Sequence, residues 1–511
     1  MPRTVIAAAS DVAAEAGRSV ADLGGNAVDA AIAATIASMS TEIGIVSPGG
    51  GAFITIWPAG SDPMVIDAYA EMPGRGLSST ASVSTDRVHM EYGGGMDTVV
   101  GWGSVATPGA FAGFDVASRH HGSAPWVELF GRTIEVLQRG FAVSEASGYY
   151  LGYAHDVIYG WDPETARMYH RSDGSPVRGG DVITNIDLAD CLEGLASEGS
   201  DLLYRGELGV ALIRASQARG GLITRHDLEE YVPVGRAPSR IGLRGWEIAT
   251  NAPPAVGGVT MTALLKLMEH LDISRWSADA VAKYAAAQDA VFSFRRAELD
   301  GDTDRFAGSD LLLALAGAGD PAAVHRSPST VHASAVDETG LACSITASAG
   351  YGSGAVIPGT GFGLNNSLGE VELTSEGLHV LAPGARLLSN MAPTVARSPE
   401  GEVMALGSPG ADRITSAIAS VLLNHIVGRM DLETAVSHPR IHAEVFNGVP
   451  TLAVEPDVDT SEVQNLAIRT LPALSMYFGG VQAAMSDGAG ILAGAADPRR
   501  TGAVRVGGRS V

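Results

Sequence analysis

The chain has 511 residues, of which 46% are hydrophobic and 18% charged, a composition typical of a globular protein with a large core. Its formal net charge of −23 argues against nucleic acid and against an anionic membrane surface as partners. The two cysteines, Cys191 and Cys343, belong to no CxxC or Cys/His pattern, which argues against a zinc site and a disulfide framework.

The N-terminal residues lead directly into a helical pattern, without the apolar core and cleavage site of a signal peptide. No run of about 18 apolar residues is present, so no transmembrane helix is predicted. The sequence therefore predicts a cytoplasmic protein with no membrane partner. It predicts no metal ion and no other cofactor, and it leaves the oligomeric state, a homo-oligomer included, open.

Two helices are predicted at the start of the chain. Ser10 is a suitable N-cap for a helix that runs to Asp22, and the glycine pair that follows would end it. Asn26 caps a second helix over residues 27–34, and Asp29 is placed to complete a capping box. The second helix is apolar on nearly every side, which predicts that it is buried between layers.

Strands are predicted next, at residues 52–57 and 64–69. Residues 101–113 are rich in glycine and lead into a helix, but they contain neither GxGxxG nor GxxxxGK[ST], which argues against a nucleotide cradle. Residues 126–300 are predicted to be mostly helical. Helices followed by a meander of strands favour an α+β fold in which helices stack on an antiparallel sheet.

The region around Thr330 combines two different patterns. Residues 300–329 are rich in Asp, Gly, Ala and Ser, which predicts a mobile surface segment, although an ordinary long loop explains the composition equally well. Apolar and polar residues alternate over 331–335, which predicts a half-buried strand. Residues 337–340 supply a turn and residues 341–346 a second strand, so the unit is predicted to be a hairpin.

Residues 407–413 form a second glycine-rich turn, followed by a predicted helix over 414–423. Such a turn presents unpaired backbone N–H groups and the positive end of the helix dipole, which suits an anion such as the oxyanion of an acyl-transfer intermediate. A plain tight turn is the alternative interpretation. Within the turn, Asp412 and Arg413 are expected to be an ordinary surface or capping pair.

Ten short motifs, taken in order, resemble those of the γ-glutamyltranspeptidase family of N-terminal-nucleophile hydrolases. They are residues 23–31, 48–53, 106–114, 220–228, 253–258, 330–332, 364–366, 389–394, 407–410 and 497–500. Each motif alone is weak, but together they follow the family's order over nearly the whole chain.

The resemblance implies a four-layer αββα sandwich in which helices flank two antiparallel sheets. It also implies a precursor that cleaves its own Ser329–Thr330 bond. Residues 1–329 would become the large-subunit segment and residues 330–511 the small-subunit segment of one intertwined domain. Thr330 would be the nucleophile that attacks a small-molecule amide, and its own α-amine, with a pKa of about 7.7–8.0, would take the proton from its Oγ. Water or an amine would then resolve the acyl-enzyme.

The same resemblance implies roles for further residues. The backbone N–H groups of Gly410 and Ala411 would form the oxyanion hole, although the family has a second glycine where Ala411 stands. Ser348 matches, with an offset of two residues, a threonine that hydrogen-bonds the nucleophile. The residues that match the family's substrate-binding segments are Asn366, Ser367, Glu370, Ser389 and Asn390.

One departure from the family concerns the substrate. The γ-glutamyl enzymes bind the substrate α-carboxylate with an arginine where this chain has Ala70, and a methyl group cannot replace an arginine fork. Arg75, five residues further on, is a candidate to compensate. The change predicts that γ-glutamyl anilides are poor substrates. Two activities remain open: a γ-glutamyl hydrolase or transferase, and an amidohydrolase for another small amide, of glutaryl or oxamate type.

Other functions are weighed on the same residues. A non-catalytic member that is never cleaved, and serves as a binding or structural protein, is disfavoured because Thr330 is retained together with the glycine-rich turn. A Ser-His-Asp hydrolase is not predicted, because the chain contains no GxSxG motif. His332 lies two residues from Thr330 and would be a general base on one interpretation, but a hydrogen-bonded structural histidine is favoured.

Overall fold

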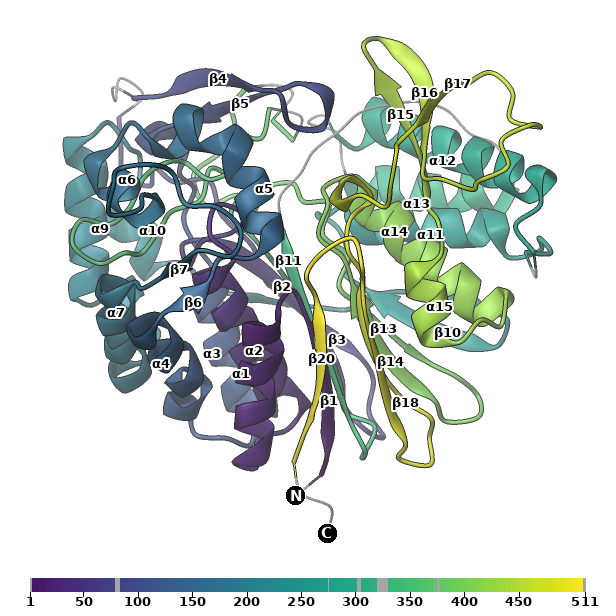
Figure 1. Cartoon of the computed structure of the whole chain (residues 1–511), viewed down its shortest axis with the longest axis horizontal. Helices are drawn as coiled ribbons and strands as arrows, with labels where there is room; N and C mark the ends of the chain where they lie inside the picture. The colour runs from purple at the N-terminus through teal and green to yellow at the C-terminus, as the bar shows by residue number, and fades with distance from the viewer. Residues whose placement is uncertain are drawn as a thin grey trace.

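Two β-sheets packed face to face form the centre of the computed structural model, and helices cover the outer face of each sheet (Figure 1). The structure describes residues 2–78, 83–273, 275–300, 305–318, 330–371, 373–374 and 377–508. The arrangement is a four-layer αββα sandwich, which confirms the α+β fold expected from the sequence.

The first sheet has seven strands, and every neighbouring pair is antiparallel. In spatial order the strands are β20 (Ala503–Gly507), β1 (Thr4–Ala8), β11 (Val331–Asp337), β12 (Ala342–Ser348), β2 (Gly51–Trp57), β3 (Met64–Ala68) and β8 (Val234–Arg236). The hairpin that follows Thr330 therefore lies in the middle of this sheet.

The second sheet has six strands, also antiparallel throughout. In spatial order they are β19 (Leu492–Ala496), β18 (Gln482–Ser486), β14 (Val403–Gly407), β13 (Thr394–Arg397), β10 (Trp246–Thr250) and β9 (Ser239–Leu243). Three small sheets lie outside the sandwich: β15 (Ile441–Phe446) with β16 (Val449–Val454) and β17 (Ala467–Thr470), β4 (Asp86–Met90) with β5 (Met96–Val100), and β6 (Phe141–Ala142) with β7 (Val182–Ile183).

The helices divide into two groups, one on each side of the sheets in Figure 1. On the side of the first sheet lie α1 (Asp11–Asp22), α2 (Ala27–Thr41), α3 (Ala110–His121), α4 (Gly131–Arg139), α5 (Glu145–Ala154), α6 (Pro163–Tyr169), α7 (Ile186–Glu198), α8 (Asp201–Tyr204), α9 (Glu207–Ala218) and α10 (Arg225–Glu229). On the side of the second sheet lie α11 (Gly257–Met268), α12 (Ala278–Glu298), α13 (Arg305–Ala318), α14 (Arg413–Leu422) and α15 (Leu432–Ser437). None of the helices in the described part of the chain is long and apolar enough to cross a membrane.

The end signals of the first two helices are confirmed. The Ser10 hydroxyl accepts a hydrogen bond from the Ala13 N–H and caps α1. Asn26 and Asp29 form the capping box of α2. All residues of α2 are buried, as its apolar sequence predicted, because the helix packs on β11 and β12 while α1, α3 and α4 cover its other sides.

The predicted hairpin is present as β11 and β12, but its strands are buried on both faces. Val331 and Ala333 contribute to the core beneath the helices. The polar side chains between them face the second sheet: a Cβ added at Gly407 would lie 2.3 Å from the His332 ring. The expectation of a half-buried strand is therefore wrong, because a second sheet covers the face that would otherwise meet solvent.

The prediction that residues 126–300 are mostly helical misses a hairpin. Strands β9 and β10 lie in this region and are joined by Arg244 and Gly245, whose φ angles of 49° and 90° are typical of a two-residue hairpin turn. The sequence signal was Gly245, which follows Arg244 between the short stretches 239–243 and 246–250.

The segment predicted to be mobile is also partly helical. Helix α13 occupies residues 305–318, and Leu312 and Ala316 are 3% and 5% exposed in the core beneath α11 and α12. The composition of the segment concealed this helix, because its leucines are outnumbered by small and acidic residues. Residues 319–329, which precede Thr330, lie outside the described residues.

Candidate active site

Segments from both sheets meet at one edge of the sandwich. In the first sheet β11 begins directly after Thr330, and β12 ends at Ser348. In the second sheet β14 ends at Gly407, where the backbone contacts the His332 ring. Because β13 and β14 are antiparallel, residues 389–393 before β13 leave the second sheet at this same edge.

The position of Thr330 follows from the register of the hairpin. Val331 pairs with Ala347, so the next pair outward is Thr330 with Ser348. Thr330 has the parity of His332 along the strand, which directs its side chain toward the second sheet. The residue is only 2% exposed. The structure thus brings together the predicted nucleophile and the serine predicted to lie beside it.

The glycine-rich turn predicted to bind an oxyanion lies between β14 and α14. Gly410 and Ala411 are buried and have φ angles of 123° and 69°. At Gly410 a side chain would also collide with Gly479, because an added Cβ would lie 2.7 Å from its Cα. Among the described residues, neither the Gly410 N–H nor the Ala411 N–H donates a hydrogen bond. The turn therefore offers two unpaired donors at the start of α14, an arrangement suited to an anion.

Asp412 and Arg413 are buried, not exposed, so the expectation of a surface or capping pair is wrong. Their ion pair spans 2.7 Å, and Arg413 Nε donates to the Tyr477 carbonyl. Burial alone would raise the pKa of Asp412, but the Arg413 guanidinium and His442 hold it below its usual range. The pair is buried because β15 and the segment containing Tyr477 cover the start of α14.

His332 lies between the sheets as a neutral, doubly bonded side chain. Its Nδ1 is 2.8 Å from the Thr346 Oγ1 and its Nε2 is 2.7 Å from the Ser334 Oγ. Burial lowers the pKa of His332 to about 3. Both ring nitrogens are occupied by neighbouring hydroxyls, so the geometry fits the structural histidine and offers no free base to Thr330.

The predicted substrate-binding residues around Asn366 lie next to Ser348. The Asn366 N–H donates to the Ala349 carbonyl at 3.0 Å, and its side-chain amide donates to Val99 and Thr98. Among the described residues, the Asn366 Oδ1 is buried without a hydrogen-bond partner. Unpaired buried polar atoms are unusual in folded proteins, and a ligand would satisfy them.

Asn365 holds this segment against the glycine loop that begins β2. Its amide donates to the Gly49 carbonyl at 2.7 Å and to the Ala106 carbonyl at 2.9 Å, while its Oδ1 accepts from the Ser367 N–H. Gly50 has no room for a side chain, because an added Cβ would lie 2.4 Å from the Ser348 carbonyl oxygen. The three motifs around residues 49, 106 and 365 thus form one support beneath Ser348.

Glu370 is also buried, and the Tyr69 hydroxyl lies 3.4 Å from its Oε1. Burial and the charge of Glu370 raise the pKa of Tyr69 well above its ordinary value, so the phenol stays protonated and can donate. Glu370 therefore presents a carboxylate at this edge, which suits an ammonium group.

Ser389 and Asn390 precede β13 on the opposite side of the edge. The Ser389 carbonyl accepts from the Val256 N–H at 2.9 Å, which fixes the backbone, and both side chains are almost fully buried. Within the described residues the Asn390 Oδ1 has no hydrogen-bond partner. Extending the β13–β14 register places Asn390 level with Gly410.

Ala70 and Arg75 have different surroundings. Ala70 lies two residues after the end of β3 and is fully buried at the same edge. The Arg75 guanidinium is held by three carboxylates: Glu71 at 2.9 Å, Glu230 at 3.3 Å and Asp227 at 3.6 Å. These ion pairs fix the loop after β3 and direct the guanidinium toward protein carboxylates.

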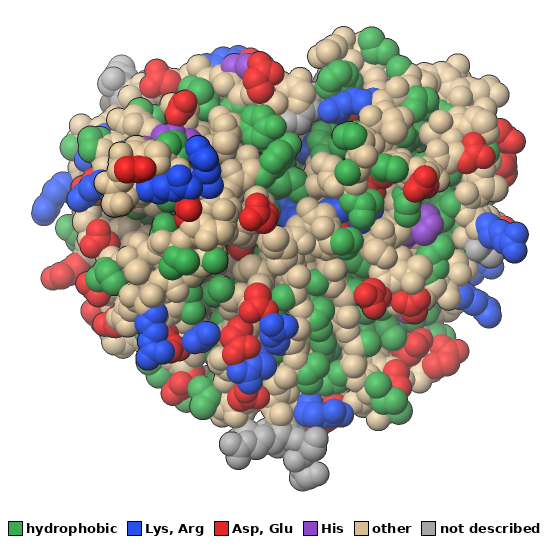
Figure 2. All heavy atoms as spheres, viewed as in Figure 1, with side chains coloured by type: hydrophobic (Ala, Val, Ile, Leu, Met, Phe, Trp, Pro, Cys, Tyr) green, Lys and Arg blue, Asp and Glu red, His purple; other side chains and the backbone are tan. Residues whose placement is uncertain are grey.

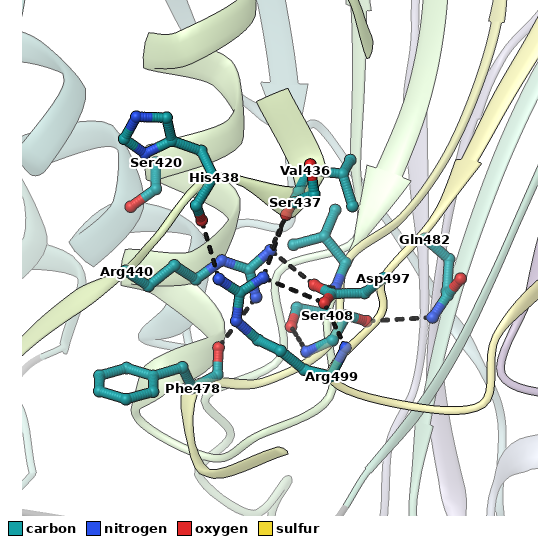
Figure 3. Close-up of polar contacts among 12 residues, drawn as sticks. Ser408, Ser420, Val436, Ser437, His438, Arg440, Phe478, Gln482, Asp497 and Arg499 are labelled. Carbon is teal, nitrogen blue, oxygen red and sulfur yellow. Dashed lines mark hydrogen bonds and ion pairs between the residues drawn. The ribbon is translucent and has the colours of Figure 1, made fainter. Parts of the chain in front are cut away.

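A buried ion-pair network that the sequence did not reveal stands behind the turn (Figure 3). The Asp497 carboxylate contacts Arg440 at 2.6 Å and Arg499 at 3.1 Å, and it accepts the Val481 N–H at 2.8 Å. Arg440 also donates to the Phe478 carbonyl. The network therefore holds residues 478–481, against which Gly410 packs. The motif at 497–500 was the only signal in the sequence.

Figure 2 shows that this face of the molecule is indented at the top, between the part that carries β4 and β5 and the part that carries β15 and β16. In the described part of the chain no group of three His, Cys, Asp or Glu side chains is arranged to hold a metal ion. The arrangement at the edge combines a hydroxyl, two unpaired backbone donors and several unsatisfied polar atoms, which suits acyl transfer.

The chain is similar to known proteins over nearly its whole length. A family model described as gamma-glutamyltranspeptidase matches residues 13–507. The glutathione hydrolase proenzyme of Escherichia coli (strain K12) is 27% identical, over 97% of this chain and 90% of that protein. The Acylase ACY 1 proenzyme of Pseudomonas sp. (strain SE83) is 32% identical, over 96% of this chain and 91% of that protein.

Solved structures share the fold. The crystal structure of cephalosporin acylase from Bacillus halodurans matches with a TM-score of 0.81 at 22% identity, over 99% of this chain and 96% of that chain. The family model covers nearly the whole chain, and its relatives along this length are hydrolase and transferase enzymes. The chain therefore belongs to the γ-glutamyltranspeptidase family of enzymes.

Proposed function

We propose that this protein is a proenzyme that cleaves its own Ser329–Thr330 bond and then cleaves a small amide through a Thr330 acyl-enzyme. The observation that carries the proposal is the meeting of Thr330, Ser348 and the unpaired N–H groups of Gly410 and Ala411 at one edge. The names of the relatives, which include the word proenzyme, support the cleavage.

Self-cleavage would begin with the Thr330 Oγ attacking the carbonyl carbon of Ser329. The peptide C–N bond breaks as the C–O bond forms, and the hydroxyl proton passes to the departing nitrogen. Water then hydrolyses the resulting ester, which leaves a carboxylate on residue 329 and a free amine on Thr330. Residues 1–329 and 330–511 become the two segments of the mature enzyme.

In turnover, the freed α-amine of Thr330 takes the proton from its own Oγ as the oxygen adds to the substrate carbonyl. The oxyanion that forms would accept hydrogen bonds from the Gly410 and Ala411 N–H groups. The C–N bond then breaks, and the leaving amine takes the proton. Water or a second amine attacks the ester, releases the acyl group and restores the threonine.

The substrate is an amide that does not depend on the arginine clamp of the γ-glutamyl enzymes. Ala70 supplies no charge, and Arg75 is committed to Glu71, Asp227 and Glu230. Two substrate classes follow, a γ-glutamyl amide held by other groups and a glutaryl- or oxamate-type amide. Relatives of both activities, a glutathione hydrolase and an acylase, align over nearly the whole chain.

The cleavage is tested by intact mass and N-terminal sequencing of the purified protein. The wild type should give two fragments, the second beginning at Thr330, whereas Thr330→Ala should give one full-length chain without amidase activity. Thr330→Ser retains a hydroxyl and should still cleave. Full activity in a wild-type chain whose Thr330 nitrogen is still in a peptide bond would refute the proposal.

A substrate comparison on the processed enzyme separates the two substrate classes. γ-Glutamyl anilide should be turned over poorly, because Ala70 cannot hold the α-carboxylate. Glutaryl anilide carries the same carboxylate without the α-ammonium, so the ratio of the two rates reports how the enzyme treats the ammonium group. A wild-type protein that stays uncleaved and inactive on every amide would instead favour the non-catalytic alternative.

A further inference from the structure

The motif at residues 497–500 holds two arginines with different surroundings. The Arg499 guanidinium lies between Glu455 and Asp497, with its Nε 2.7 Å from the Glu455 carboxylate. Figure 3 shows its contact with Asp497. The backbone N–H of Arg500, the next residue, donates to the Asp497 carbonyl at 3.1 Å, but its guanidinium makes no hydrogen bond or ion pair with the described residues, and its Nε is buried. The residue as a whole is nevertheless partly exposed.

The sheet register places Arg500 beside the candidate nucleophile. Ala503 of β20 pairs with Ala8 of β1, and Ala8 pairs on its other side with Ala333 of β11. Arg500 lies three residues before Ala503, and Thr330 lies three residues before Ala333. The two therefore leave the same edge of the first sheet, separated by two strand spacings or about 10 Å.

The side chain of Arg500 also lies toward the second sheet. An added Cβ at Gly480 would be 2.7 Å from the Arg500 Cγ and 2.9 Å from its Cδ, so the arginine stem lies across this glycine. The Gly480 N–H in turn donates to the Ser408 Oγ at 3.0 Å. Ser408 begins the turn that contains Gly410. Arg500 is therefore linked through Gly480 to the turn that carries the unpaired N–H groups of Gly410 and Ala411.

In the described part of the chain, no carboxylate forms an ion pair with the Arg500 guanidinium. Burial lowers its pKa, while Tyr92, Glu42 and Asp497 act in the opposite direction from longer range. The Glu42 carboxylate is instead held by the Ser144 hydroxyl at 2.7 Å. Asp497 is occupied by Arg499 and Arg440, as described above. A largely buried cation without a partner is costly, and an anionic ligand would supply that partner.

We propose that Arg500 binds a carboxylate of the substrate and so limits the enzyme to amides that carry a negative charge near the scissile bond. The proposal rests on the proposed function of Thr330 and extends it to substrate class. A guanidinium holds a carboxylate through two parallel hydrogen bonds, a geometry that lysine lacks. The carboxylate lies either on the acyl group, as in a glutaryl amide, or on the amine that leaves.

The test compares matched substrates on processed wild-type, Arg500→Gln and Arg500→Lys enzymes. Glutaryl anilide and its neutral 4-carbamoylbutanoyl counterpart probe the acyl side. The pentanoyl amide of 4-aminobenzoate and plain pentanoyl anilide probe the amine side. Arg500→Gln should lower kcat/KM roughly 10- to 100-fold for a carboxylated substrate and less than about threefold for its neutral partner. For the carboxylated substrate, the kcat/KM of Arg500→Lys should lie between the values of the wild type and Arg500→Gln. The substrate pair that responds to the substitution shows whether the carboxylate lies on the acyl group or on the leaving amine.

Two further measurements separate recognition from structure. Arg397→Gln removes another partly buried arginine, stacked on Trp57 at the opposite edge, and should leave the charged-to-neutral ratio unchanged. Calorimetric titration with glutarate and with 4-aminobenzoate reports the contact without turnover, and Arg500→Gln should bind one of them at least tenfold more weakly. The proposal would be overturned if Arg500→Gln lowered kcat/KM equally for charged and neutral substrates. It would also be overturned if the variant left both the charged-to-neutral ratio and the binding of the two ligands unchanged. Those results would leave cleavage at Thr330 unaffected.

Discussion

At Ala411 a methyl group occupies a backbone conformation that favours glycine. Its φ of 69° belongs to the left-handed region, where a Cβ costs about 1–2 kcal/mol. The residue is buried and carries one of the two unpaired N–H groups, so the strain lies at the candidate oxyanion turn. Strain of this kind persists where the surrounding structure fixes the backbone, and here Gly410 is fixed against Gly479.

Ala411→Gly should therefore raise the free energy of unfolding by about 1 kcal/mol, because the glycine adopts this conformation without strain. The donor is a backbone N–H and is retained, so kcat/KM should change by less than about threefold. Thermal unfolding and steady-state kinetics measure the two effects. A loss of stability, or a tenfold loss of activity with stability unchanged, would show that the methyl group itself contributes to the turn.

The hairpin of β11 and β12 places the candidate nucleophile, because β11 begins directly after Thr330. Its inner face carries hydroxyls and one histidine where most sandwiches have aliphatic side chains, and His332 is bonded to Thr346 and Ser334. A neutral buried histidine makes the element sensitive to acid, because the unfolded chain accepts a proton that the folded chain excludes.

The sign of this effect follows from the pKa of about 3 in the folded protein and about 6.5 in the unfolded chain. The stabilisation is fully present above pH 6.5 and is lost as the pH falls toward 3. Between pH 7 and pH 5, His332 should cost the wild type about 2 kcal/mol of folding free energy. His332→Asn should lose correspondingly less over this interval, although it starts less stable.

Denaturant unfolding at both pH values measures this difference. Ser334→Ala removes one hydrogen bond of His332 but keeps the titrating ring, so its pH dependence should match that of the wild type. Identical pH dependence in wild type and His332→Asn would mean that the histidine takes up its proton at the same pH in the folded protein as in the unfolded chain.

The two proposed segments are interleaved throughout the molecule. Strands β11 and β12 of residues 330–511 lie between β1 and β2 of residues 1–329 in the first sheet. In the second sheet β10 of the first segment pairs with β13 of the other. Each sheet is thus built from both segments, and neither segment has a complete core of its own.

Cleavage before Thr330 should consequently leave the molecule in one piece. The two fragments should co-elute in gel filtration and separate only in denaturant, with the uncleaved Thr330→Ala variant eluting at the same volume. The shared backbone hydrogen bonds of β1 with β11 and of β2 with β12 account for this behaviour. Native elution as two separate fragments would contradict the sheet order.

Local signals were enough to predict some of this molecule. The caps at Ser10 and Asn26 act within one helical turn, and the alternation after Val331 belongs to one strand, so each could be predicted from neighbouring residues. The burial of Asp412 depends on β15, and the open guanidinium of Arg500 depends on Gly480. These contacts join distant parts of the chain, and no local pattern encodes them.

The strand order also sets a sequence of events during synthesis. Thr330 leaves the ribosome before Gly410 and Ala411, and long before β18, which pairs with β14 at the turn. A nascent chain would therefore display its hydroxyl while the groups proposed to stabilise the tetrahedral adduct are still untranslated. The proposed peptide-bond scission would then wait for the second sheet to close, which would protect the growing chain from early cleavage.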